Sequence, residues 1–161
     1  MLNWAKGVGK YKWKLCGRTF SWDGEHADDP GDVLWIGTSF AHVTISPTEV
    51  TVGGTQKYTM RVPHEREGAT VRIEVGFPAE ATVAYFETKA GWTIEHKMDA
   101  DGRIVGVVWS GGFIGEHEFA EFNFLARNPR EAATLEWTVR QIYADGSDSE
   151  WNPATRVRAA P

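Results

Sequence analysis

Histidine side chains are the clearest candidates for chemistry in this sequence of 161 residues. Four of the five histidines fall after residue 41: His42, His64, His96 and His117. Imidazole is a frequent ligand of copper and zinc, yet none of the four shows the His-x-x-x-His spacing of many zinc sites. Cys16 is the only cysteine, which excludes a disulfide within one chain and a cysteine-rich zinc site. Spacing alone therefore does not define a metal centre.

Catalytic groups are harder to find than metal ligands. The sequence contains no Gly-x-Ser-x-Gly elbow or comparable motif that would pair a nucleophile with a base, so we do not expect an enzyme. Glu116, Glu118 and Glu121 surround His117, but on a strand the first two would share one face and Glu121 would take the other. This group is interpreted as the solvated edge of a sheet.

Composition limits the classes of protein that this chain can represent. Its length suits one ordinary domain, and 42% hydrophobic with 24% charged residues is typical of a globular protein. The net charge of −5 argues against a nucleic-acid partner, because neutralising phosphates requires an excess of Lys and Arg. No run of residues is long and apolar enough to predict a transmembrane segment.

Residues 1–41 differ in character from the rest of the chain. They pass from a basic into an acidic stretch, and we expect an irregular leader. The tetrapeptide Thr38-Ser39-Phe40-Ala41 is similar to a signal-peptidase site, although Val33–Ile36 is too short for the apolar core of a signal peptide. Two alternatives stay open: a degenerate or mis-started signal region, or an extra strand that pairs beside His42.

Short alternating segments separated by turn residues follow from residue 42 to the end. In residues 70–77, Val71, Ile73, Val75 and Phe77 alternate with charged or small residues, as in a half-buried strand. The spacing predicts about nine short strands and an all-β, immunoglobulin-like antiparallel β-sandwich over residues 42–161. The expected strands are 42–45, 50–52, 56–62, 70–77, 81–86, 92–97, 104–110, 118–126 and 135–143.

Six motifs in this domain resemble, in order, landmarks of the YcnI-like copper-binding family. They are HVTISP (42–47), YTMRVPHE (58–65), Gly91-Trp92, IVGVVWSG (104–111), EFAEFNFLARN (118–128) and YADGSDSEW (143–151). The resemblance covers nearly all of residues 42–153 and implies an immunoglobulin-like sandwich that is exported to the periplasm or secreted.

The resemblance also implies a Cu(II) site called a mono-histidine brace. By position, His42 would chelate copper through its α-amine and ring nitrogen, Glu65 would supply a carboxylate, and Trp151 would lie beside the metal. Nitrogen and oxygen donors in a tetragonal plane suit Cu(II). Without the resemblance, Glu65 reads as an exposed carboxylate at a strand end and Trp151 as a packing residue.

Two features depart from the family pattern. His42 is preceded by Ala41, and an amide nitrogen cannot act as the amine donor without losing its proton. His64 adjoins Glu65, and strand alternation places its side chain on the opposite, surface side.

The resulting hypothesis is a non-enzymatic copper carrier, store or accessory in copper trafficking outside the cytoplasm. Its partners would be the copper ion and copper-trafficking proteins. The alternative is a metal-free immunoglobulin-like interaction domain in which His42 only begins a strand. A free α-amine on His42 would distinguish the two.

Overall fold

A computed structural model describes the backbone of residues 10–15, 18–23, 42–64 and 66–160, and the side chains of the last two ranges. The chain divides into two compact units, Met1–Gly37 and Thr38–Pro161. In the first, β1 (Lys10–Leu15) pairs antiparallel with β2 (Arg18–Asp23). In β1 the segment KYKWKL alternates lysines with large apolar residues, a pattern that strands favour. The rest of the predicted irregular leader, residues 1–9, 16–17 and 24–41, lies outside the described residues. The boundary at residue 41 stays a prediction.

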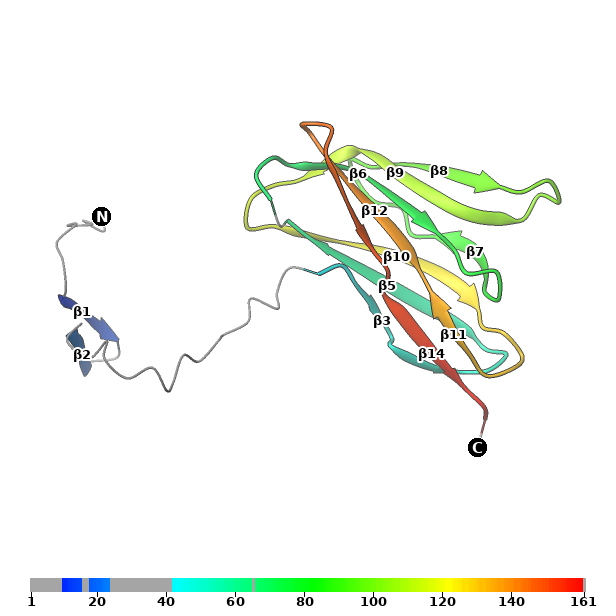
Figure 1. Ribbon diagram of the computed structural model, residues 1–161, viewed down its shortest axis with the longest axis horizontal. Helices are drawn as coiled ribbons and strands as arrows, with labels where there is room; N and C mark the ends of the chain where they lie inside the picture. Colours follow the sequence, from blue (N-terminus) through cyan, green and yellow to red (C-terminus); the bar gives the residue numbers. More distant parts are fainter. Residues whose placement is uncertain (1–9, 16–17, 24–41, 65, 161) are drawn as a thin grey trace. The chain divides into compact units, whose positions relative to one another are not determined.

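The second unit is the predicted β-sandwich, and its described residues include no helix (Figure 1). A four-stranded sheet has the order β3-β5-β10-β7 and faces a five-stranded sheet of order β13-β12-β6-β9-β8. A three-stranded sheet, β11-β14-β4, completes the unit. The strands are β3 (Thr44–Ser46), β4 (Glu49–Thr51), β5 (Thr55–Pro63), β6 (Thr70–Gly76), β7 (Thr82–Phe86), β8 (Thr93–Met98), β9 (Ile104–Ile114), β10 (Phe119–Arg127), β11 (Ala133–Glu136), β12 (Thr138–Tyr143), β13 (Asp148–Trp151) and β14 (Ala154–Arg158).

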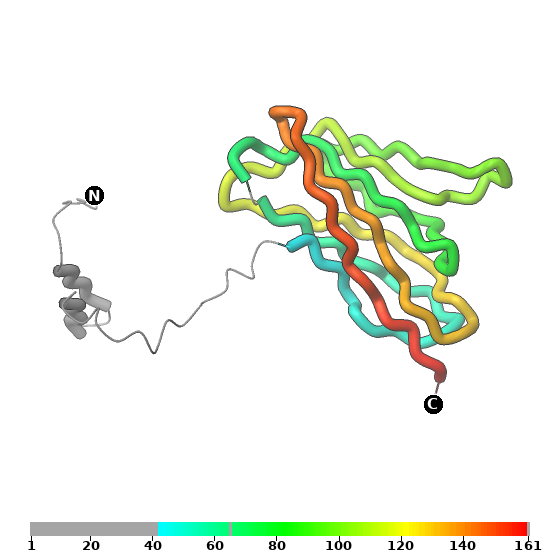
Figure 2. The backbone as a smooth tube through the Cα atoms, viewed as in Figure 1, coloured from blue at the N-terminus to red at the C-terminus, as the bar shows by residue number. Residues whose placement is uncertain are grey.

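Eight of the nine predicted strands are present as single strands, and the C-terminal part differs from the prediction. The single strand expected over 135–143 is two strands, because the chain leaves one sheet at Trp137 and enters another. Strands β13 and β14 return beside β12 and β11, so residues 133–158 form one long hairpin, orange to red in Figure 2. Strand β14 also pairs with β4 in parallel, unlike the antiparallel pairs elsewhere among the described strands.

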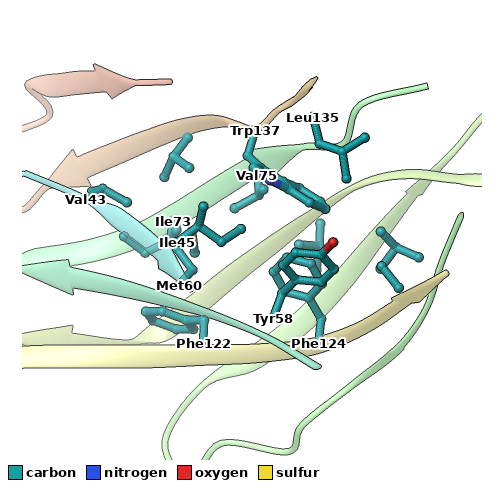
Figure 3. Packing of buried hydrophobic residues seen from close by; sticks show 14 of the residues in the cluster. Val43, Ile45, Tyr58, Met60, Ile73, Val75, Phe122, Phe124, Leu135 and Trp137 are labelled. Carbon is teal, nitrogen blue, oxygen red and sulfur yellow. The ribbon is translucent and has the colours of Figure 1, made fainter. Parts of the chain in front are cut away.

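The core lies between the sheets and is rich in aromatic rings (Figure 3). Tyr58 and Phe124 stack with ring centroids 5.6 Å apart, and Trp137 packs against both. The predicted alternation in β5 is confirmed, since Tyr58, Met60 and Val62 are all buried. In β6 the alternation holds at Ile73 and Val75 but breaks at the other end of the strand, where a bulge leaves Val71 half-buried.

One buried hydrogen bond fastens the end of the sandwich where β5 begins. The Tyr58 hydroxyl donates to Asn128 Oδ1 at 2.6 Å, and Asn128 Nδ2 donates to the Thr51 carbonyl at 2.8 Å. Burial raises the pKa of Tyr58 to about 12 from an ordinary value of 10.0. The neutral phenol therefore contributes stability that is fully present below pH 10 and is lost as the pH rises toward 12.

We predict that the free energy of unfolding of the wild-type protein falls more steeply between pH 10 and 12 than that of a Tyr58→Phe variant. A two-unit shift in pKa corresponds to about 2 to 3 kcal/mol, so the difference should be of that order. Urea unfolding at several pH values measures it. Parallel curves for the two proteins would contradict the assignment.

Candidate functional site

Two of the three residues that the sequence predicts to form the site lie in contact. His42 is exposed and leads into β3, while Trp151 is the half-buried last residue of β13. The two rings meet edge to face, with centroids 5.0 Å apart and planes inclined by 66°. Glu65 lies outside the described residues. The structure therefore brings His42 to the tryptophan that was predicted to lie beside the metal.

Strand pairing explains how residues so far apart in the sequence meet. Strand β3 is an edge of the four-stranded sheet and pairs with β5 so that Thr44 faces Arg61. Because the pairing is antiparallel, the start of β3, into which His42 leads, lies beside the end of β5 that precedes residue 65 in the sequence. Strand β13 is an edge of the opposite sheet. The site thus lies where the edges of the two sheets approach each other.

Hydrophobic packing holds the Trp151 side chain in place, and no hydrogen bond of its indole nitrogen contributes among the described residues. Its indole packs against the hydrophobic core, and its buried Nε1 has no acceptor among the described residues. On the same hairpin, Arg140 Nε donates to Asp148 Oδ2 at 2.9 Å, a hydrogen bond that lowers the pKa of Asp148. Strand pairing and core packing together fix the ring that His42 touches.

The residues on either side of position 65, His64 and Arg66, both make contacts with the rest of the domain. The His64 amide donates to the Glu118 carbonyl at 3.0 Å, and His64 Nε2 lies 3.0 Å from the Gly68 carbonyl. On the other side, the Arg66 guanidinium lies over the Tyr143 ring, 5.1 Å from its centroid. His64 is half-buried, and its hydrogen bond to Gly68 lies at the exposed surface, in keeping with its interpretation as a surface residue.

The remaining histidines lie away from the His42–Trp151 contact. His96 stacks on Phe86 with centroids 4.9 Å apart. His117 is exposed in the turn after β9, with a φ of 61°, and its Nε2 lies 3.5 Å from Glu116 Oε1. In residues 42–64 and 66–160, no three His, Cys, Asp or Glu side chains gather as a metal site would require.

Sequence reasoning did not anticipate Gln141, a fully buried residue of β12. Its Nε2 donates to the Pro63 carbonyl at 3.0 Å and to Thr70 Oγ1 at 2.7 Å. A glutamine in an inward-facing position of the alternating segment VRQIY was the available signal, since an uncompensated amide is costly to bury.

Comparison with solved structures defines the class of this domain. A crystal structure of an uncharacterized protein from Nocardia farcinica, described as having an immunoglobulin-like fold, matches with a TM-score of 0.63 at 26% identity. The match covers 75% of this chain and 99% of that one. A cohesin module from Clostridium perfringens matches with a TM-score of 0.52 at 11% identity, over 74% of this chain and 99% of the module. The predicted immunoglobulin-like sandwich is confirmed.

Sequence comparison then identifies the family. Residues 42–160 match the model of the domain of unknown function DUF1775, and the chain belongs to this family. The copper-binding protein CutI of Bacillus subtilis is 34% identical over 113 residues, which cover 69% of this chain and 55% of CutI. This chain thus spans about half the length of that relative. The resemblance stated from the sequence motifs is confirmed.

We predict that His42→Ala leaves the stability of the protein nearly unchanged but alters its tryptophan fluorescence. An exposed side chain contributes little to stability, so the change should be within about 0.5 kcal/mol. Loss of the ring beside Trp151 should shift the emission spectrum.

His117→Asn provides the matched control. Asparagine tolerates the positive φ of that exposed turn, and neither stability nor emission should change. Identical spectra for wild type and His42→Ala would contradict the ring contact in solution.

Proposed function

We propose that this protein binds copper as Cu(II), with the His42 ring nitrogen, the His42 α-amine and the Glu65 carboxylate as ligands. The observation that carries the proposal is the contact between His42 and Trp151, two residues that share no secondary-structure element. The family relationship to a protein named as copper-binding supports the choice of metal. The donor set also fits, because two nitrogens and a carboxylate oxygen suit tetragonal Cu(II).

The chemistry of the amine adds a requirement for processing. The His42 nitrogen is an amide while Ala41 precedes it, so the proposed site forms only when the chain is cleaved between these residues. Cleavage after a small-residue pattern is the signature of export, and we infer that the mature protein acts outside the cytoplasm. No helix able to cross a membrane occurs in the described parts of the chain.

Trp151 would act beside the metal rather than bind it. The indole covers one side of the His42 ring and limits the rotamers that the ring can adopt, which preorganises it for a ligand. Its buried Nε1–H, which has no acceptor among the described residues, remains able to donate toward a group bound there. The same contact makes Trp151 a fluorescent reporter of binding.

We further propose that the protein carries or stores copper and is not an enzyme. An exposed histidine at a sheet edge leaves a bound ion open to transfer to another protein. The alternative function, a metal-free interaction domain, would require only the sandwich itself.

A copper titration followed by tryptophan fluorescence tests the proposal on the full chain and on a protein that begins at His42. The match covers 99% of the Nocardia farcinica protein chain, which supports the expectation that a domain of this size folds alone. Tight binding should require the His42 start, and Glu65→Gln should weaken it at least tenfold by removing the anionic ligand. Equal, weak binding by all the proteins would leave the metal-free alternative. His117→Asn is the control for non-specific histidine binding.

We also predict that copper affinity of the His42-start protein falls as the pH decreases. The α-amine must lose its proton to bind, and its ordinary pKa is roughly 8. Below that value the apparent affinity should fall about tenfold for each pH unit. Competition with a chelator of known affinity, repeated from pH 8 to pH 6, measures this dependence. A flat profile would exclude the amine as a ligand.

A further inference from the structure

We propose that Gln141 is a positioning residue for the copper site, acting through the chain segment that contains Glu65. This inference rests on the proposed function and concerns how the site is held in place. Gln141 is fully buried in β12 of the five-stranded sheet, yet its amide donates to the Pro63 carbonyl at the end of β5 in the opposite sheet. The hydrogen bond therefore joins the two sheets at the end where His42 lies.

Gln141 makes a second hydrogen bond, so that its side chain binds both ends of the loop of residues 64–69. We call this pair of hydrogen bonds the clamp. Pro63 is the last residue before the loop of residues 64–69, and Thr70 is the first residue after it. Gln141 Nε2 donates to both, at 3.0 Å to the Pro63 carbonyl and at 2.7 Å to Thr70 Oγ1. One amide nitrogen thus holds both ends of the loop at a fixed separation.

A bulge in β6 makes the clamp possible. Strand β12 pairs Ile142 with Arg72 and then Tyr143 with Thr70, so Val71 is skipped. Without the bulge, Thr70 would share the face of Arg72 and Glu74. With it, the Thr70 side chain is fully buried and reaches Gln141. Bulges of this kind commonly redirect a side chain beside functional sites.

Burying the polar side chain of Gln141 costs free energy that an apolar core residue would not cost. Gln141 Oε1 is buried and has no donor among the described residues. Leaving such an acceptor unpaired destabilises the fold, whereas a leucine there would bury only apolar atoms. The other buried polar side chains in the described ranges serve other parts of the fold: Asn128 accepts from Tyr58, and Thr155 accepts from Trp137 Nε1.

Gln141 is also connected to the strands that position His42 and Trp151. Pro63 ends β5, the strand that pairs with β3, and His42 leads into β3. Strand β12, which contains Gln141, pairs with β13, which contains Trp151. Gln141 therefore contacts the end of the strand that pairs with β3, and it belongs to the hairpin that contains Trp151. Losing its hydrogen bonds should let the loop shift relative to both rings while the aromatic core stays packed.

Gln141→Leu tests the proposal in the protein that begins at His42. The substitution removes both hydrogen bonds at similar volume, and removing a support behind a metal ligand typically weakens binding 10- to 100-fold. We expect Cu(II) affinity to fall at least tenfold and the copper EPR parameters to change, measured well below the unfolding temperature. Thr70→Val is a milder second variant that removes one partner, with a smaller loss expected.

Tyr58→Phe is the matched control, because it removes a buried hydrogen bond from the opposite end of β5. It should lower the unfolding temperature and leave copper affinity and the EPR spectrum unchanged. Wild-type affinity and spectrum in both Gln141→Leu and Thr70→Val would overturn the proposal. A loss of affinity in Tyr58→Phe equal to that in Gln141→Leu would also overturn it, since the effect would then be one of stability. Absence of binding by the unsubstituted protein would instead refute the proposed function itself.

Discussion

The position of Trp137 between two sheets is the constraint on which the rest of the sandwich depends. At this residue the chain leaves β11 and enters β12, and the Trp137 amide donates to the carbonyl of Pro153, which lies between β13 and β14. The indole is fully buried against Tyr58, Phe77 and Phe124, and its Nε1 donates to Thr155 Oγ1 at 3.2 Å. Both arms of the hairpin pass from the three-stranded to the five-stranded sheet at this point, β11 into β12 and β13 into β14 in the reverse direction. As a result, β13 lies at the sheet edge where Trp151 contacts His42.

The strands that bury alternating apolar side chains could be predicted from the sequence, because each has a face that must leave water. The segments at β5, β6 and β10 show this pattern clearly. Strands β13 and β14 were missed because their signal is weak: DSEW buries no residue completely, and ATRVR turns only Thr155 and Val157 inward. The division at Trp137 was also unpredictable, since a change of sheet leaves the hydrophobic alternation uninterrupted.

The candidate site was predictable only in part, and from the order of sequence motifs rather than from hydrophobic alternation. Motif order pointed to His42, Glu65 and Trp151, and in the structure the first and last of them are in contact. Nothing local to the sequence indicates that β3 and β13 are sheet edges that face each other, because this follows from the long-range pairing of strands. The roles of Gln141 and His64 were likewise hidden, since both depend on carbonyl groups of other segments.

The exposed charges of the two outer strands in the five-stranded sheet bear on how the molecule behaves in a crowded solution. Strand β13 exposes Asp148 and Glu150, and β8, at the other edge, exposes Glu95 and Lys97. Open strand edges attract further strands, and charged side chains oppose such growth because their hydration would be lost on pairing. The border beside Trp151 is thus resistant to edge-to-edge aggregation, and the surface around His42 stays accessible at high protein concentration.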